Sequence, residues 1–233
     1  MRYPPFGMAA LSILVLTLAA TSAFGSVEQL HYGSKVKLND VDEGRALSPF
    51  NLAPEFAFWD TGIVGVFDRE DVVYINIDPR SDKVSENDIR LTPFGELPAG
   101  SQVGKADNDI GKPLTKFGRG NVPRAELRFL DTGGDWAYNL DDPIYLNVVP
   151  GEINAGDIRI SNYKGFPAGS RVNDTDPDNG LKTQTLPGML SFFNSNGNIN
   201  NAGYAIYDRG DIVYLDTQQP FYVVTINDVR LSM

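Results

Sequence analysis

The segment that decides the fold runs from Gly33 to Gly44 and reads GSKVKLNDVDEG. It aligns without a gap with GSQVGKADNDIG, which starts at Gly100, and with GSRVNDTDPDNG, which starts at Gly169. The three copies share the pattern G-S-x-V-x-x-x-D-x-D-x-G, and their starts lie 67 residues (33 to 100) and 69 residues (100 to 169) apart. Similarity at a nearly fixed period indicates a repeat architecture with units of roughly 70 residues.

Three further motifs recur at a similar spacing: an aromatic residue followed by Asp-Thr-Gly, a tyrosine-centred apolar segment, and a D-I-R-L tetrad. In the second motif apolar residues alternate with Tyr and Asn, a period of two that is typical of half-buried strands. Asp-rich tetrads at 68–71 and 208–211 precede such segments and indicate hairpin turns. The copies are FWDTG from Phe58, FLDTG from Phe129 and the looser FFNSNG from Phe192; VVYIN to Asn76, PIYLN to Asn147 and IVYLD to Asp216; and DIRL from Asp88, DIRI from Asp157 and DVRL from Asp228.

The predicted fold class is all-β, because no segment after residue 25 shows the apolar stripe of an amphipathic helix. The chain contains 23 glycines and 15 prolines, which suit many tight turns. We expect three tandem units of about four strands each, at about 58–117, 129–186 and 192–233.

The third unit lacks its G-S-x-V strand, and a spare copy of that strand stands at 33–37. The array is therefore circularly permuted. The spare strand either closes the third unit of its own chain, which gives a pseudo-threefold arrangement, or completes a neighbouring molecule, which gives a strand-exchanged array. Closure within the chain costs less entropy and is the preferred alternative.

Residues 1–25 have the layout of a secretory signal peptide, with Arg2, an apolar run at 8–20 and a small-x-small exit at Ala23-Phe24-Gly25. The run is shorter than the roughly 20 residues that a spanning helix needs, although an uncleaved anchor is the alternative. No second apolar run follows. We therefore expect a mature chain of residues 26–233 that is secreted to the extracellular cell surface and has no membrane span.

Composition argues against several classes of function. The chain has no cysteine and a single histidine, His31, which excludes a zinc-thiolate site and makes a Ser-His-Asp triad improbable. Its formal net charge is -10, and removal of Arg2 with the signal leaves 19 basic against 30 acidic residues, or -11. Such a surface repels phosphate backbones, so nucleic acid is not an expected partner. We expect a protein without enzymatic activity.

The D-x-D-x-G loops are the candidate metal sites, because alternating carboxylates followed by Gly can wrap a hard cation such as calcium. The loops lack the closing Glu of an EF-hand, and the alternative is a turn in which Asp caps its own backbone. No other cofactor is expected. The candidate ligands are Asp40, Asp42, Asp107, Asp109, Asp174, Asp176 and Asp178.

Two other recurring sets have structural and functional interpretations. The D-I-R-L tetrads place Asp and Arg on one strand face, which favours structural ion pairs with neighbouring strands, at Asp88/Arg90, Asp157/Arg159 and Asp228/Arg230. The recurring tyrosines could bind sugars if exposed, or could cover the sheet edge if half-buried; they are Tyr74, Tyr145 and Tyr214, beside Asn76, Asn147 and Asp216. Asn173-Asp174-Thr175 is a glycosylation sequon.

The D-I-R-L and G-S-x-V-x-x-x-D-x-D-x-G motifs resemble those of exported surface proteins of methanogenic archaea, in particular the tubular sheath proteins. This resemblance covers about residues 26–233 and implies a cell-envelope protein that polymerises into a β-rich, amyloid-like sheath. The first functional hypothesis is accordingly a self-assembling structural subunit of a sheath or surface layer, whose partner is a second copy and also other envelope proteins. The alternative is a secreted glycan-binding or adhesion module with three equivalent sites.

Overall fold

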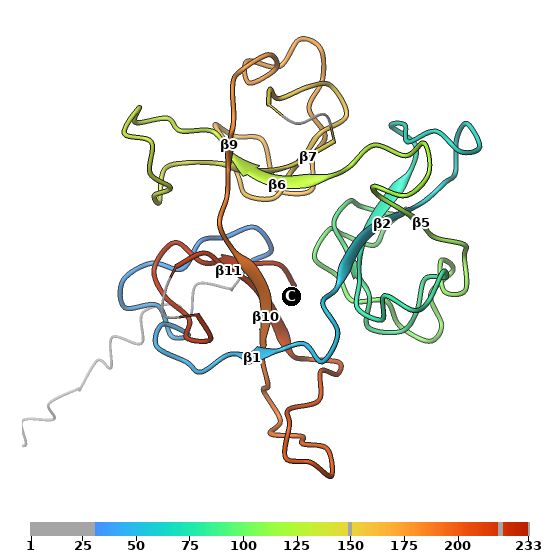
Figure 1. Cartoon of the computed structure of the whole chain (residues 1–233), viewed down its shortest axis with the longest axis vertical. Helices are drawn as coiled ribbons and strands as arrows, with labels where there is room; N and C mark the ends of the chain where they lie inside the picture. Colours follow the sequence, from blue (N-terminus) through green and yellow to red (C-terminus); the bar gives the residue numbers. More distant parts are fainter. Residues whose placement is uncertain (1–30, 149–150, 219–220, 233) are drawn as a thin grey trace, which may run out of the picture.

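The computed structural model describes residues 31–148, 151–218 and 221–232, so the predicted signal peptide lies outside the described residues. Within these ranges the chain forms twelve strands and no helix. The strands make three four-stranded antiparallel sheets that surround a common centre (Figure 1). The expected all-β fold of three repeats in a pseudo-threefold arrangement is confirmed.

Each sheet has the connectivity of a Greek key, in which three consecutive strands are followed by a fourth that returns to lie beside the first. The sheet orders are β4-β3-β2-β5 in unit 1, β8-β7-β6-β9 in unit 2 and β12-β11-β10-β1 in unit 3. The strands are β1 Ser48–Pro49, β2 Glu55–Trp59, β3 Val72–Asn76, β4 Ile89–Arg90, β5 Thr115–Lys116, β6 Glu126–Phe129, β7 Ile144–Asn147, β8 Ile158–Arg159, β9 Gln184–Thr185, β10 Met189–Phe193, β11 Ile212–Asp216 and β12 Val229–Arg230.

The N-terminal segment completes unit 3 of its own chain. Lys35 forms a β-bridge with Val229, and the Val36 amide donates to the Asp228 carbonyl at 2.8 Å. Further along the segment, β1 pairs with β10. Closure within the chain is therefore the alternative that the structure adopts, and the circular permutation is confirmed.

The structure corrects the role of the G-S-x-V segment. We expected it to supply the fourth strand of each unit, but it makes only a single bridge to the D-I-R-L strand, as at Ile89–Gln102 and Ile158–Arg171. The fourth strand comes later in the chain, as β5, β9 and β1. The N-terminal complement of unit 3 is thus longer than the expected strand at 33–37 and extends to Pro49.

A single apolar core lies between the three sheets, and each unit supplies five equivalent buried side chains to it. Because both faces of each central strand are covered, these strands are buried along their length. The core residues are Phe58, Val73, Ile75, Ile89 and Leu91; Phe129, Ile144, Leu146, Ile158 and Ile160; and Phe192, Val213, Leu215, Val229 and Leu231.

The glycine of each G-S-x-V motif lies where the units approach most closely. Gly33, Gly100 and Gly169 have φ of 73°, 81° and 81°, a region that favours glycine. A Cβ on Gly100 would lie 2.4 Å from the Cβ of Tyr32, and one on Gly169 would lie 2.4 Å from the Cβ of Ala99. Both the backbone conformation and the space therefore require glycine here.

Candidate functional site

Each unit contains one buried network that joins the D-I-R-L tetrad to the D-x-D loop. In unit 1 the guanidinium of Arg90 donates to both carboxylate oxygens of Asp109, at 2.8 and 2.7 Å, and to Asp107 at 2.7 Å. The Tyr74 hydroxyl donates to Asp109 at 2.7 Å, and Ser101 accepts from Arg90 at 3.1 Å. This bidentate geometry is the strong form of an arginine–carboxylate interaction.

The same network recurs in the other two units with the same atoms. In unit 2 the central pair is Arg159 with Asp178, with Tyr145, Asp176 and Ser170 around it. In unit 3 the arginine is Arg230, and its partners come from the N-terminal segment: Asp42, Asp40 and Ser34, with the Tyr214 hydroxyl on Asp42. The G-S-x-V-x-x-x-D-x-D pattern is therefore the sequence signature of a buried arginine site.

The electrostatics of this network are those of a structural element. The pKa of Asp107 is lowered by hydrogen bonds from the Gly104 amide and from Arg90, and the pKa of Asp176 is lowered chiefly by Arg159. Burial acts to raise the pKa of Asp42, but its bonds to Arg230 lower it overall. Since the three arginine side chains are almost completely buried, none can reach a ligand in solvent.

The aspartates of the D-I-R-L tetrads do not pair with arginine, which corrects our expectation. Asp88 accepts from the backbone amides of Ile77 and Ser85, at 2.9 and 2.7 Å, and so fixes the turn after β3. Asp157 and Asp228 make the equivalent bonds. Burial raises the pKa of Asp88 to about 7 and those of Asp157 and Asp228 to about 6, against the opposing effect of the backbone bonds.

The recurring tyrosines are fully buried rather than half-buried at an edge. Tyr74, Tyr145 and Tyr214 have no exposed surface, and each hydroxyl is used by an aspartate of its own network. They therefore cannot stack on a sugar, and the interpretation of these residues as glycan-binding sites is wrong.

Six of the seven candidate calcium ligands are engaged by the arginines. The seventh, Asp174, is exposed and lies 3.9 Å from Arg69. Across the described ranges no three acidic or histidine side chains are grouped so that they could hold a metal ion. Calcium binding at the D-x-D loops stays a prediction, and it would require each carboxylate pair to give up its guanidinium.

The variable residue of G-S-x-V joins each unit to the next. Gln102 of unit 1 contacts Tyr207 and the Asp211 carbonyl of unit 3. Lys35 of unit 3 donates to the Asn139 and Leu140 carbonyls of unit 2, at 3.0 and 2.8 Å. Arg171 of unit 2 donates to the Asp71 carbonyl of unit 1 and lies over the Phe67 ring. These three contacts form a closed cycle, which we call the inter-unit locks.

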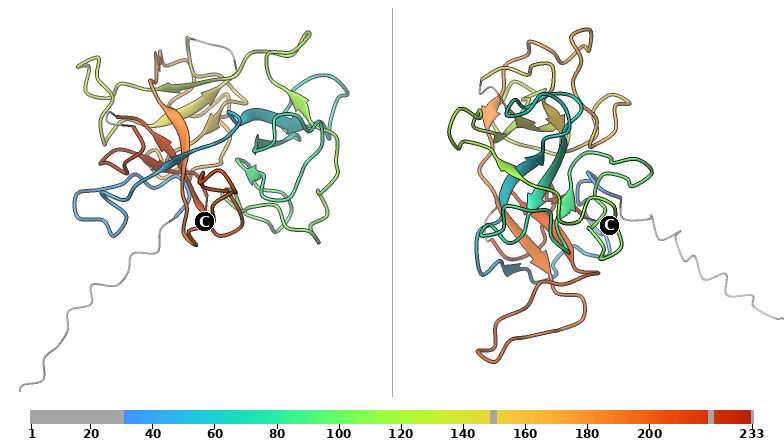
Figure 2. Two further views of the ribbon diagram at one scale, coloured as in Figure 1. Left: turned by 60° about the horizontal axis from the view of Figure 1, so that its bottom comes forward. Right: turned by 90° about the vertical axis from the view of Figure 1, so that its right-hand side faces the viewer.

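The hairpin loops that receive these locks project from three sides of the molecule (Figures 1 and 2). We call residues 60–71, 131–142 and 194–211 arms 1, 2 and 3. Each arm ends in large apolar side chains that face solvent: Val64 is 91% exposed in arm 1, Trp136 80% in arm 2, and Tyr204 65% in arm 3. Ile63, Val66, Leu140, Ile199 and Ile206 are further exposed apolar residues of the arms.

The arms are held in shape by side chains at their bases. Asp131 accepts from the amides of Gly134 and Trp136, at 2.5 and 2.7 Å, and Trp136 has a φ of 64°. Asp60 in arm 1 accepts from the Gly65 amide in the same way, and Asn194 in arm 3 accepts from the Gly197 amide. A non-glycine residue in this backbone region persists only where its surroundings enforce it.

Sequence reasoning identified the turns that precede β3 and β11 but missed the arm tips as a surface. The available signal was the spacing of apolar residues between D-T-G and the Asp-rich tetrads, as in Ile63-Val64-Gly65-Val66. That signal is weak, because in an all-β chain a short apolar run is also typical of a strand.

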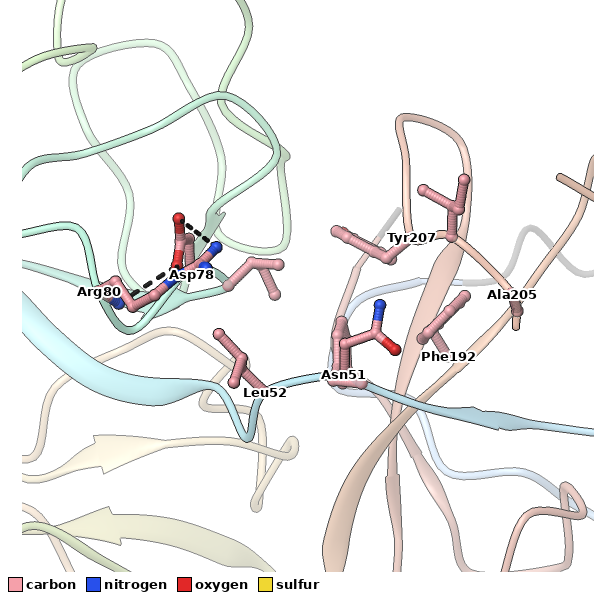
Figure 3. A pocket seen from close by; sticks show the side chains of 10 residues that line it. Asn51, Leu52, Asp78, Arg80, Phe192, Ala205 and Tyr207 are labelled. Carbon is pink, nitrogen blue, oxygen red and sulfur yellow. Dashed lines mark hydrogen bonds and ion pairs between the residues drawn. The ribbon is translucent and has the colours of Figure 1, made fainter. Parts of the chain in front are cut away.

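A pocket of about 210 Å³ lies where the Phe50–Leu52 linker passes between units 1 and 3 (Figure 3). Its lining is mostly apolar and includes Phe192 and Tyr207. Its charged groups, Asp78 and Arg80, are bonded to one another at 2.8 Å. The lining therefore offers no unengaged acid, base or nucleophile for catalysis.

Comparison of the chain with protein-family models, with curated proteins and with solved structures found no match. Within the described residues no helix has the length and apolarity needed to cross a membrane.

Proposed function

We propose that the protein is a structural subunit of an extracellular sheath or surface layer and that it assembles with further copies of itself through the tips of its three arms. The observation that carries this proposal is the combination of a locked pseudo-threefold body with three ordered, apolar-tipped projections. The proposal includes export through residues 1–25, and the resemblance to tubular sheath proteins supports the same role.

The arms suit lateral contacts between rigid subunits. Exposed apolar side chains gathered on ordered loops are typical of interaction surfaces, because burying them on a partner costs little conformational entropy. Aromatic side chains such as Trp136 and Tyr204 are enriched among residues that dominate binding energy. Three projections around one body also provide enough contacts to extend an assembly in two dimensions.

The buried networks explain why such a subunit needs no disulfide. Each Arg–Asp–Tyr network ties the loops of one unit to its sheet, and the inter-unit locks tie the three units into a cycle. An exported protein without cysteine must obtain its rigidity from packing, ion pairs or assembly. The networks and locks supply packing and ion pairs, and they leave the arm tips available for assembly.

The experiment is sedimentation velocity and negative-stain electron microscopy of the purified chain over a concentration series. The wild type should form large assemblies as concentration rises. A triple variant with polar tips, Val64→Ser, Trp136→Asn and Tyr204→Ser, should remain monomeric; asparagine is chosen at 136 because it tolerates positive φ. The Leu38→Ser and Val41→Ser variant removes apolar side chains that are exposed outside the arms and serves as the matched control.

Two results would count against the proposal: a wild type that stays monomeric at every concentration, or a triple variant that assembles as well as the control. A folded triple variant, checked by its thermal unfolding, makes the second result interpretable.

A glycan-binding module remains the second candidate, and one observation favours it: Trp136 and Tyr204 are exposed aromatics. Their backbone amides donate to the side chains of Asp131 and Asn200, which are a carboxylate and an amide. This candidate differs from the first in its test, because it requires saturable binding on a glycan array that the double variant Trp136→Asn, Tyr204→Ser abolishes while the protein stays monomeric.

A further inference from the structure

One cross-strand pair in each unit carries a single carboxylate. The pairs are Glu55–Asn76 between β2 and β3, Glu126–Asn147 between β6 and β7, and Met189–Asp216 between β10 and β11. In units 1 and 2 the carboxylate stands on the first strand of the pair and an amide stands opposite. In unit 3 the acid stands on the second strand of the pair, because Met189 occupies the position of the glutamate and Asp216 that of the asparagine.

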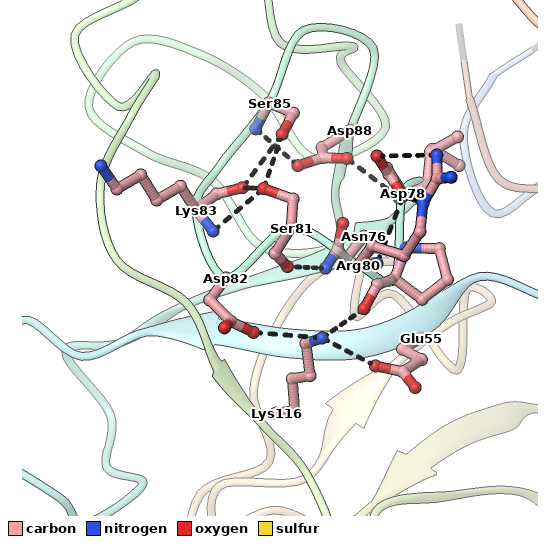
Figure 4. Close-up of polar contacts among 12 residues, drawn as sticks. Glu55, Asn76, Asp78, Arg80, Ser81, Asp82, Lys83, Ser85, Asp88 and Lys116 are labelled. Atoms are coloured by element: carbon pink, nitrogen blue, oxygen red, sulfur yellow. Dashed lines mark hydrogen bonds and ion pairs between the residues drawn. The ribbon is translucent and has the colours of Figure 1, made fainter.

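Unit 1 places an ammonium group against this carboxylate. Lys116 on β5, opposite Ala57, is largely buried; its Nζ lies 3.4 Å from Glu55 and 3.2 Å from Asp82, and it donates to the Pro79 carbonyl. Figure 4 shows this cation between β2 and the turn that follows β3. The buried charge is thus compensated on several sides.

Unit 2 supplies its cation from β6, the strand that also carries the carboxylate. Arg128 on β6, paired with Thr185 on β9, lies 3.4 Å from Glu126. Its guanidinium also donates to the hydroxyls of Thr183 and Thr185, at 2.7 and 3.2 Å. The cation therefore comes from either strand of one pair: β5 in unit 1 and β6 in unit 2.

Unit 3 keeps the acid but has lost the cation. The equivalent strand pair is Ser191–Pro49, and neither residue carries a charge. Asp216 is fully buried, and no lysine or arginine of the described residues forms an ion pair with it. Its Oδ2 accepts from the Tyr222 amide at 2.7 Å. Within the described residues its Oδ1 has no hydrogen-bond partner, a property that it shares with the Oδ1 atoms of Asn76 and Asn147, but the equivalent atom here carries charge, and the buried Ser191 Oγ beside it has no partner either.

We propose that a small monovalent cation binds in unit 3 at the Asp216 carboxylate and the Ser191 hydroxyl, and takes the part that Lys116 and Arg128 play in the other two units. Ser191 on β10 lies directly opposite Tyr214 on β11. Tyr214 and Asp216 are two residues apart on β11 and therefore share a face, so the Ser191 hydroxyl and the Asp216 carboxylate lie on the same side of the sheet. This inference is independent of the assembly proposed above.

The charge of the ligand follows from the repeat. In each sister unit the buried cation beside the corresponding acid is singly charged, Lys116 in unit 1 and Arg128 in unit 2, and the second cation near Glu55, Arg119, is exposed to solvent. Asp216 is the only carboxylate of its cross-strand pair. A divalent ion would add an uncompensated positive charge in a buried site, which is costly. Sodium, potassium and ammonium are therefore the ions to test, with calcium as the contrasting divalent ion. Burial raises the pKa of Asp216, against the opposing effect of the backbone groups of Tyr222 and Gln218.

The test is thermal unfolding of the dilute monomer at neutral pH in sodium, potassium, ammonium or calcium chloride, with ionic strength held constant by choline chloride. Binding to the folded state raises the midpoint of unfolding with cation concentration. At several times the dissociation constant, we expect a rise of roughly 2–4 °C for a chain of this size.

Two variants remove the need for the ion in different ways. Asp216→Asn restores the neutral amide of units 1 and 2, and Ser191→Arg introduces the guanidinium that Arg128 supplies in unit 2. Both should lose the dependence on monovalent cations, and Ser191→Arg should exceed the wild-type midpoint in choline alone. Asp174→Asn, which changes an exposed carboxylate, should keep the wild-type response.

Three outcomes would overturn the inference: a wild-type midpoint that does not respond to the small cations, an Asp216→Asn variant that responds as the wild type does, or a response to calcium alone. If the midpoint does not respond and Asp216 is found protonated at pH 7, the buried carboxyl of unit 3 is neutralised by a proton rather than by a bound cation.

Discussion

Gln102 of unit 1 donates a hydrogen bond from its Nε2 to the hydroxyl of Tyr207 in unit 3 at 2.6 Å. The same side chain accepts from the Gly210 amide through its Oε1 at 3.1 Å. The side-chain amide of Gln102 thus joins the first and third units at the base of arm 3. In the same way Lys35 holds the base of arm 2 and Arg171 holds the base of arm 1. The position that the repeat leaves variable in sequence is the one that connects the units.

The first prediction concerns these locks. Lys35→Met keeps the length of the side chain but leaves the carbonyls of Asn139 and Leu140 without their donor. The bonds to the carbonyls of Asn139 and of Asp142, which Lys35 also reaches, are partly buried, whereas water can replace the lysine at the exposed Leu140 carbonyl. Partly buried acceptors left unsatisfied should lower the free energy of unfolding by about 1–3 kcal/mol in total. Urea denaturation measures it, with Lys37→Met as the exposed control. Equal stabilities for the two variants would contradict a role of Lys35 in holding the units together.

The second prediction concerns the arginine networks. Arg90→Met, Arg159→Met and Arg230→Met each leave a buried carboxylate without its cation, which costs about 3–5 kcal/mol. Only Arg230→Met should in addition release the N-terminal segment, because Asp40 and Asp42 reach unit 3 from that segment. Limited proteolysis should then cut between residues 31 and 50 in Arg230→Met alone. Equal cleavage of the three variants would show that the network does not hold this segment.

The third prediction separates space from backbone conformation at glycine. Gly100→Ala would place a Cβ 2.4 Å from Tyr32 and also occupy positive φ, so we expect a loss of about 2–4 kcal/mol. Gly111→Ala meets nothing within 4 Å at a similar φ of 76°, and should cost about 1 kcal/mol. If the two variants unfold at the same denaturant concentration, close packing at the centre is not what requires Gly100.

The fourth prediction concerns pH. Asp88, Asp157 and Asp228 have folded-state pKa values raised to about 7, 6 and 6, so they retain protons that the unfolded chain releases near 3.8. Their stabilising contribution is complete below about pH 4 and is lost as the pH rises through 6 to 7. The lowered pKa values of Asp42, Asp107 and Asp176 act in the opposite sense and are lost only on further acidification.

The free energy of unfolding should therefore be greatest near about pH 4 and decline as the pH rises from about 4 to 7. Asp88→Asn, which cannot ionise, should make that decline shallower. Denaturant unfolding across the pH series measures both curves. A stability that increases steadily from acid to neutral pH would show that the backbone bonds to Asp88 outweigh its burial.

The repeat carried most of the fold that could be predicted from the sequence. The tyrosine-centred segments became β3, β7 and β11 because period-two alternation reports strand pairing directly. The structure of the G-S-x-V segment was harder to predict, because a segment with a single β-bridge and a full strand have the same local sequence pattern. Only the packing around Gly100 distinguishes the two. The permutation was visible because a missing motif at one end matched a spare motif at the other.

The candidate site was predicted less well, because its chemistry depends on which repeats meet in space. Asp107 and Asp109 were interpreted as possible metal ligands, yet a carboxylate pair suits an arginine as readily as an ion, and sequence spacing does not tell them apart. The sequence did not predict a role for Asp216, because aspartate at this position is a conservative replacement for Asn76 and Asn147. The difference between the units depends on the strand pairing, which places Lys116 opposite Ala57 in unit 1 and Arg128 opposite Thr185 in unit 2.

The closure of unit 3 by the N-terminal segment has a consequence for biogenesis. Arg230 and Lys35 are separated by 195 residues yet are hydrogen-bonded, so the third sheet cannot close until residues 228–231 have been synthesised. Units 1 and 2 have all their strands in continuous order, but the locks that bind them into a ring require unit 3. A nascent polypeptide therefore lacks the closed ring of three units until residues 228–231 are available to pair with residues 33–36.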